Sequence, residues 1–201
     1  EKFHAPGIEQ SPRGTPDRAP LIVWNHRWEY DKNPDDFFEA LFLLDEQGLD
    51  FKVAILGEDF LHHSGNPVFE AARVKLKDKV VHYGYAEDFT RYAQWLYRAD
   101  IVPVTSRQEF FGISLVEALY CGCYPLLPKR LTYPELVPYE TYPEVFYADF
   151  QELVEKLARA VQEIDTIRQR SFRHCIKQYA WEHLADVYDA AFEGMKGVDC
   201  K

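Results

Sequence analysis

Short apolar runs alternate with amphipathic stretches along the chain from residue 21 onward. The apolar runs, each of a length typical of a buried strand, are 21–25, 51–56, 79–83, 101–104, 124–127 and 145–147. The amphipathic stretches, which have helical periodicity, are 34–46, 68–76, 89–97, 112–120 and 150–164. Strands that alternate with helices in this way predict an α/β domain with a Rossmann-like, doubly wound parallel sheet. A ligand is then expected at the carboxyl ends of the strands.

The two ends of the chain depart from this alternation. Residues 1–20 are rich in Pro, Gly, Asp and Arg and show little periodicity, which predicts a linker or a disordered lead-in. Toward the other end, tail helices are expected from about residue 165, and the last helical region, near 167–192, is expected to break around Tyr179. Residues 21–201 are long enough to form one domain around a single core.

Composition and charge narrow the classes of function. The net charge of −10 argues against nucleic acid or an anionic bilayer as a partner of this surface alone. The sequence has no run of about 18 apolar residues and no signal peptide at its start. Its four cysteines lack zinc-site spacing, and His62 and His63 have no Asp or His partner at ligand spacing, so no metal site is expected. Cysteines of this kind are typical of reduced thiols, which favours a cytoplasmic protein.

The segment EFFGISLVE at 109–117 carries the clearest chemical signal. Two carboxylates, Glu109 and Glu117, bracket Gly112 where a strand and a loop lead into a helix. A glycine at a helix N-terminus lets a ligand approach exposed backbone N–H groups, and these groups favour an anion such as a phosphate. Carboxylates accept hydrogen bonds from sugar hydroxyls. The segment therefore indicates a nucleotide-sugar site, although the spacing of the two carboxylates alone also fits solvated side chains on a helix.

The segment WNHRWEYDKNP at 24–34 follows the first predicted strand. It lacks the G-x-G-x-x-G fingerprint of dinucleotide-binding domains, which disfavours a dehydrogenase. Arg27 and Lys32 lie where a diphosphate would sit, and Arg supplies a planar fork while Lys supplies a mobile point charge. A solvated basic pair would give the same pattern. His26, beside Arg27, fits either a ligand contact or a structural hydrogen bond.

Together these two segments resemble the motifs of retaining glycosyltransferases with the GT-B fold, in the large family four. The Glu-x7-Glu signature of that family reads roughly E-G-F-G, and here Phe110 replaces the first glycine. The family's G-R-x-x-x-x-K-G motif keeps the same Arg-to-Lys spacing, with His26 and Asn33 in place of its glycines. The resemblance implies the carboxyl-terminal, donor-binding half of a GT-B enzyme, with the amino-terminal acceptor-binding domain absent from this chain.

Within the family, the amino-acid sequences of several segments are most similar to those of the tRNA-queuosine α-mannosyltransferase group. These segments are 24–34, 82–85, 109–112, 122–128 and 133–136. The similarity implies that mannose passes from GDP-mannose to queuosine in tRNA with retention and without a metal or other cofactor. The tRNA would be held through the missing domain, so this half alone would be inactive. A family-four transferase with another donor and a lipid or polysaccharide acceptor, and a non-catalytic nucleotide-sugar binding module, remain open alternatives.

The resemblance also implies roles for individual residues. Glu109 would orient the sugar, and Arg27 and Lys32 would stabilise the departing diphosphate, which makes these three the catalytic set. Glu117 would hold the ribose hydroxyls. The remaining donor-binding residues would be His26, Gly57, Tyr85, Phe110, Phe111, Gly112 and Ile113. Gly57 and the turn before Tyr85 fit tight strand-to-helix turns equally well. Tyr92, Trp95 and Tyr97 have helical spacing, which favours core packing over a platform on which a base would stack.

Overall fold

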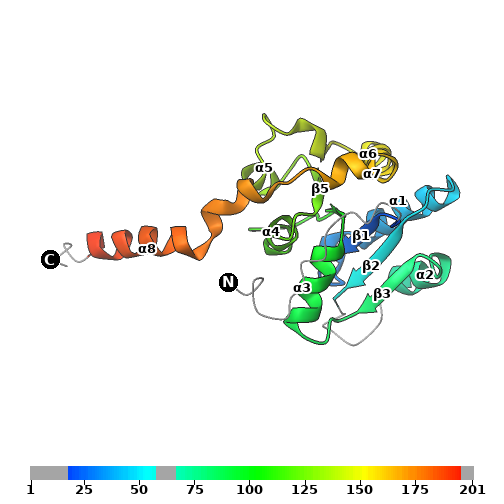
Figure 1. Ribbon diagram of the computed structural model, residues 1–201, viewed down its shortest axis with the longest axis horizontal. Coiled ribbons are helices and arrows are strands. Elements are labelled where there is room, and N and C mark those ends of the chain that lie inside the picture. The colour runs from blue at the N-terminus through cyan, green and yellow to red at the C-terminus, as the bar shows by residue number, and fades with distance from the viewer. Residues whose placement is uncertain (1–17, 58–66, 196–201) are drawn as a thin grey trace.

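The computed structural model describes residues 18–57 and 67–195. Within this part, six parallel strands form one sheet in the order β3-β2-β1-β4-β5-β6 (Figure 1). The strands are β1 Leu21–Trp24, β2 Lys52–Leu56, β3 Val80–Gly84, β4 Ile101–Pro103, β5 Tyr124–Pro128 and β6 Phe146–Tyr147. This order confirms the predicted doubly wound, Rossmann-like sheet. Residues 1–17 of the predicted lead-in lie outside the described residues, and so do His62 and His63.

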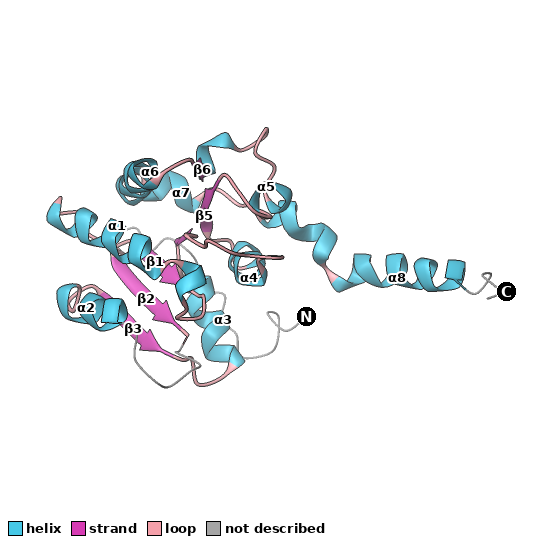
Figure 2. Cartoon of the chain, turned by 180° about the vertical axis from the view of Figure 1, so that it is seen from behind, coloured by secondary structure: helices cyan, strands magenta, loops and turns pink. Residues whose placement is uncertain are grey.

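Helices cover both faces of the sheet. They are α1 Pro34–Glu46, α2 Pro67–Lys75, α3 Phe89–Arg98, α4 Ile113–Tyr120, α5 Tyr133–Leu136, α6 Phe150–Gln162, α7 Ile164–Arg168 and α8 Trp181–Met195. Helix α1 packs between α2 and α6, whereas α3 packs against α4, so these two groups lie on opposite faces (Figures 1 and 2). None of the helices in the two described ranges is both long and apolar enough to cross a membrane.

Local sequence signals account for where the helices begin. Pro34 occupies the first turn of α1, where its fixed φ and missing N–H do no harm. The side chains of Asp88 and Asp149 cap α3 and α6, each accepting a hydrogen bond from a first-turn backbone N–H. Gly112 precedes α4 with a φ of +90°, so that helix begins at Ile113, one residue later than the sequence predicts. A left-handed backbone at this point is what favours glycine.

The tail beyond α6 is helical in separate pieces. A 3₁₀ helix, Arg173–Tyr179, packs on α4, and the chain is extended at Ala180 before α8 begins. The break therefore falls next to Tyr179, where the sequence predicts it. Helix α8 projects away from the rest of the chain (Figure 2), with the side chains of Trp181 and Phe192 exposed.

A buried carboxylate holds the amino ends of the central strands together. Asp100, which is 2% exposed, precedes β4 and accepts a hydrogen bond from the backbone N–H of Leu21 at 2.8 Å. The Arg18 guanidinium contacts both of its oxygens at 2.9 Å, and Arg168 Nε of α7 lies 3.1 Å from Oδ1. Arg18 lies in the segment predicted as a lead-in, and this ion pair fixes it to the domain. Strand β1 lies at the centre of the hydrophobic core, and its four residues are all buried.

Candidate functional site

The loops after β1 and β4 meet at the point where the strand order reverses. The backbone N–H of Arg107 donates to the carbonyl of Asp31 at 2.7 Å. The Thr105 hydroxyl lies 2.9 Å from the carbonyl oxygens of both Lys32 and Asn33. Because adjacent loops leave a doubly wound sheet in opposite directions here, the carboxyl edge between β1 and β4 forms a crevice suited to a ligand.

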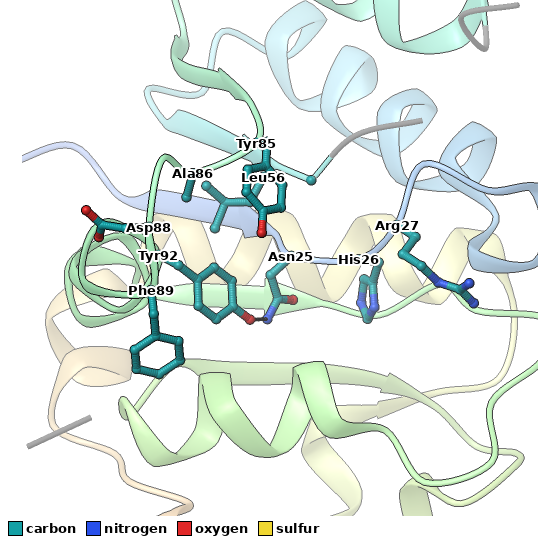
Figure 3. Close-up of a pocket in the computed structure, with 10 residues that line it drawn as sticks. Asn25, His26, Arg27, Leu56, Tyr85, Ala86, Asp88, Phe89 and Tyr92 are labelled. Carbon is teal, nitrogen blue, oxygen red and sulfur yellow. Dashed lines mark hydrogen bonds between the residues drawn. The ribbon is translucent and has the colours of Figure 1, made fainter. Parts of the chain in front are cut away.

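A cavity of about 300 Å³ lies on one side of this crevice (Figure 3). Its walls come from the ends of β1 and β2, the loop after β3, and α3. The lining residues are Asn25, His26, Arg27, Leu56, Gly57, Tyr85, Ala86, Asp88, Phe89 and Tyr92. Four residues expected from the sequence to bind a donor or stabilise its diphosphate, namely His26, Arg27, Gly57 and Tyr85, are among them.

Gly57 lets the loops after β1 and β2 approach closely. Its φ is +103°, and a Cβ added at this position would lie 2.7 Å from the carbonyl oxygen of His26. A separation that short is a steric clash with backbone, so glycine is required here for its conformation and for space. The structure thus gives Gly57 a backbone role in addition to its place in the cavity wall.

The His26 side chain is buried and connects the cavity to α4. Its Nδ1 lies 2.9 Å from the Ser114 hydroxyl, and its carbonyl accepts a hydrogen bond from the Trp24 indole N–H at 2.9 Å. Burial, together with the positive charge of Lys32, lowers the pKa of His26 to about 4. The imidazole is therefore neutral at pH 7. His26 thus makes the structural hydrogen bond that was one of its two expected roles, and it also lines the cavity.

Lys32 lies among carboxylates and is nearly enclosed. Its side chain is 9% exposed, and Nζ lies 3.0 Å from Asp31 Oδ2 and 3.2 Å from Glu109 Oε2. Nζ also donates to the carbonyl of Gln108 at 3.1 Å. The residue predicted to bind phosphate is thus held in the crevice by two acidic side chains rather than extended into solvent.

The Glu109 carboxylate covers backbone N–H groups that the sequence assigns to a phosphate. Its Oε1 accepts from the N–H of Phe110 at 3.0 Å and of Phe111 at 3.4 Å. Burial raises the pKa of Glu109, but Lys32 and the two N–H groups outweigh it, and the pKa lies below its ordinary value. The Glu109 side chain therefore places a negative charge at the start of α4.

The side chains around this turn point elsewhere. Phe110 is 97% exposed, and Ile113 is also exposed. The ring of Phe111 packs edge-on against Tyr179 with centroids 5.1 Å apart. These three residues and Gly112 do not line the cavity, so any part they take in ligand binding would come from their backbone or from the outer rim.

Arg27 is more exposed to solvent than Lys32. Its side chain is 57% exposed and pairs with Glu29 at 3.1 Å. Figure 3 shows its guanidinium at one end of the row of lining side chains, beyond His26 and away from Tyr92. Arg27 can therefore reach a ligand at the rim, whereas Lys32 is fixed inside the crevice.

Glu117 is linked to the cavity by Tyr92, a residue that the sequence predicts to pack in the core. Its Oε2 accepts a hydrogen bond from the Tyr92 hydroxyl at 2.6 Å, across the contact between α4 and α3. Asn25 Nδ2 donates to the same hydroxyl at 3.3 Å and to the Ser114 carbonyl at 2.8 Å. Tyr92 lines the cavity instead of being only a core residue, while Trp95 and Tyr97 do not line it. No motif marks Asn25 or Tyr92; the only signal is that Asn25 directly follows β1.

In the part of the chain that the structure describes, no cluster of three or more His, Cys, Asp or Glu side chains is arranged to hold a metal ion. Arg27 and Lys32 are cationic side chains that an anionic ligand could meet near the crevice.

Sequence comparison places the chain among glycosyltransferases. The model of the family described as glycosyl transferases group 1 matches residues 8–183. A tRNA-queuosine alpha-mannosyltransferase of Drosophila melanogaster is 43% identical over 119 residues, which are 59% of this chain and 31% of that protein. A GDP-mannose-dependent phosphatidylinositol dimannoside mannosyltransferase of Mycobacterium tuberculosis is 25% identical over 176 residues, which are 82% of this chain and 42% of that protein. The chain spans less than half the length of these relatives.

Solved structures share the fold at low sequence identity. TarM superposes with a TM-score of 0.69 at 18% identity, covering 90% of this chain and 37% of that chain. The C-terminal domain of a group 1 family glycosyl transferase, LpcC from Francisella tularensis, superposes with a TM-score of 0.61 at 19% identity. That match covers 79% of this chain and 84% of the solved domain. The comparisons confirm the resemblance carried by segments 24–34 and 109–117.

Proposed function

Because the chain belongs to the glycosyl transferases group 1 family, we propose that it is the donor-binding half of a retaining mannosyltransferase. In this proposal the donor is GDP-mannose and the acceptor is queuosine in tRNA. The names of the two relatives support the sugar, and one of them supports the nucleotide. The Drosophila relative supports the acceptor, which would be held mainly by a part of the enzyme beyond this half.

The observation that carries the proposal is a two-sided site at the reversal of strand order. On one side lies a cavity of about 300 Å³, the size at which small-ligand sites begin. On the other side, Lys32 and Glu109 meet at the start of α4. The hydrogen bond between His26 and Ser114 joins the two sides. A nucleoside in the cavity would place its diphosphate and sugar toward Lys32 and Glu109.

In the proposed reaction the bond between the anomeric carbon and the diphosphate oxygen breaks. The acceptor hydroxyl oxygen forms the new bond on the same face, and its proton passes to the departing phosphate. Charge builds on the diphosphate as it leaves, and Lys32, Arg27 and backbone N–H groups at the start of α4 would stabilise that charge. No protein nucleophile takes part, and Glu109 orients the sugar through its hydroxyls.

The Glu109 side chain adds one requirement to this scheme. Its Oε1 covers the N–H groups of Phe110 and Phe111. For the donor to use these groups, the carboxylate must rotate toward the sugar hydroxyls. The negatively charged diphosphate would then take the place of the Glu109 carboxylate beside Lys32.

A second candidate is a transferase of the same family with a different donor or with a lipid or polysaccharide acceptor. The Mycobacterium relative, whose name gives a phosphatidylinositol dimannoside, supports a lipid acceptor. A silent binding module is a third candidate, but the ordered contacts of Lys32, Glu109 and Glu117 favour a working site. The acceptor distinguishes the first candidate from the second. The full-length protein should therefore be supplied with GDP-mannose and either tRNA whose queuosine carries no sugar or a lipid acceptor.

Binding by this half tests the donor directly. Calorimetric titration with GDP-mannose, GDP, UDP and ADP should show a preference for the guanine nucleotides. The substitution Glu117→Ala should weaken the binding of these nucleotides. Glu70→Ala is the matched control, because Glu70 also accepts a tyrosine hydroxyl, from Tyr83 at 2.9 Å, but Tyr83, unlike Tyr92, does not line the cavity. A preference for UDP or ADP would overturn the donor, and an unchanged affinity in Glu117→Ala would overturn the ribose role.

A further inference from the structure

Side chains from three elements meet beside the cavity, and two of them, Asn25 and Tyr92, line it. Tyr92 of α3 stands between Asn25, which follows β1, and Glu117 of α4. The Tyr92 hydroxyl donates to Glu117 Oε2 at 2.6 Å, and Asn25 Nδ2 lies 3.3 Å from the same hydroxyl. Figure 3 shows Asn25 and Tyr92 side by side on the wall, joined by this hydrogen bond. The carboxylate of Glu117 is thus tied to two other parts of the domain.

The directions of these hydrogen bonds are fixed by their partners. Asn25 Nδ2 donates at 2.8 Å to the carbonyl of Ser114, which can only accept. The amide nitrogen must therefore face this side, and it is also the donor to the Tyr92 oxygen. The single proton of the Tyr92 hydroxyl is then left for Glu117. The chain of donors runs from Asn25 through Tyr92 to the carboxylate.

The environment keeps the Tyr92 proton in place. Burial, followed by the negative charge of Glu117, raises the pKa of Tyr92 far above its ordinary value. The phenol is therefore a donor at every physiological pH. A hydrogen bond from a neutral donor to a carboxylate is short and strong, and it restricts the rotation of the acid side chain.

We propose that Tyr92, which lines the cavity, is a positioning residue for nucleotide recognition: its hydroxyl fixes the Glu117 carboxylate beside the cavity, where that carboxylate would receive the ribose hydroxyls. This inference rests on the proposed function, because it takes from it the ribose role of Glu117. Asn25 supports Tyr92 by holding its hydroxyl from the end of β1. Without the phenol, Glu117 would remain on α4 but would no longer be held against α3.

The second tyrosine–glutamate pair of the chain provides a control. Tyr83 donates to Glu70 at 2.9 Å, and neither residue lines the cavity. Tyr92→Phe and Tyr83→Phe each remove one hydroxyl from a tyrosine–glutamate pair and keep the ring. Any general cost of losing such a pair appears in both variants, whereas an effect on the nucleotide should appear only in Tyr92→Phe.

The test compares GDP with its 2′,3′-dideoxy analogue in the wild type, Tyr92→Phe, Tyr83→Phe and Glu117→Ala. The wild type should bind GDP about tenfold more tightly than the analogue, as expected for hydrogen bonds to a charged group. In Tyr92→Phe the affinity for GDP should fall to that for the analogue, and the affinity for the analogue should not change. Tyr83→Phe should behave as the wild type.

The outcomes separate a failure of the inference about Tyr92 from a failure of the proposed ribose role of Glu117. If Tyr92→Phe binds both nucleotides more weakly by the same factor, Tyr92 is structural and this inference fails. The inference also fails alone if Tyr92→Phe keeps the wild-type preference while Glu117→Ala loses it. If the wild type does not distinguish GDP from its analogue, or if Glu117→Ala keeps full affinity, the ribose role itself is wrong and the inference fails with it.

Discussion

Glu109 and Lys32 form an ion pair of 3.2 Å in which the carboxylate lies on backbone N–H groups at the start of α4. The same side chain is therefore both a partner of the cation and an occupant of an anion site. This arrangement stabilises the turn, because the two N–H groups and the nearly enclosed Lys32 ammonium all have hydrogen-bond partners. It also means that an anionic ligand has to compete with a residue of the protein.

Replacing Glu109 by glutamine should strengthen the binding of GDP. The amide keeps a similar shape but removes the negative charge that competes with the diphosphate, so the affinity for GDP should rise about three- to tenfold. Calorimetric titration measures this, and Glu46→Gln, at the end of α1, is the control with the same change in charge. A weaker affinity for GDP in Glu109→Gln would show that the carboxylate does not compete.

Gly57→Ala should destabilise the domain more than Gly84→Ala does. Both glycines have a positive φ, +103° and +116°, but only the Cβ at position 57 would clash, with the carbonyl of His26. The left-handed backbone costs about 1 kcal/mol in each variant, and the clash should add about 1–3 kcal/mol at Gly57. Thermal unfolding of the two variants checks this. Equal melting temperatures would contradict the close approach of the two loops.

The stability of the domain should depend on pH through His26. Its pKa is about 4 in the folded protein, below that of an unfolded histidine. The unfolded chain therefore binds more protons in the interval between these values, and stability falls as the pH decreases from about 6.5 to 4. The loss should reach about 3 kcal/mol at most. His26→Gln should flatten this slope in urea unfolding at several pH values, and an unchanged slope would rule His26 out as its cause.

Asp100→Asn should be among the most damaging single changes. The substitution leaves Arg18 and Arg168 without their carboxylate, and breaking a buried ion pair costs about 3–5 kcal/mol. Asp45→Asn removes a carboxylate from an exposed pair with Lys79 and should cost less than about 1 kcal/mol. Chemical denaturation of both variants gives the comparison. A loss in Asp100→Asn no larger than in Asp45→Asn would contradict its role as an anchor.

The sheet could be predicted from the sequence because its signals are local. Apolar runs alternate with amphipathic stretches, and the stretches at 34–46, 68–76, 89–97, 112–120 and 150–164 each begin within about one residue of a helix in the structure. Such signals need only neighbouring residues to be interpreted. The break beside Tyr179 could be foreseen for the same reason.

The contacts within the site could not be predicted in this way. Lys32 and Glu109 are 77 residues apart, and Tyr92 and Glu117 are 25 apart, so their pairing depends on how the sheet is assembled. The family resemblance draws attention to both glutamates but gives no partner for either. Tyr92 has the spacing of a core residue, and only the tertiary structure shows that it lines the cavity and that its hydroxyl reaches Glu117.

The anchor at Asp100 lies at the amino edge of the sheet, whereas the cavity lies at the carboxyl edge. At the cavity side, the loops after β1 and β4 are joined through the backbone carbonyls of 31–33. The contacts that anchor the sheet and the side chains that meet a ligand therefore lie at opposite edges. A side chain of the cavity can thus be replaced without touching the ion pairs of Asp100.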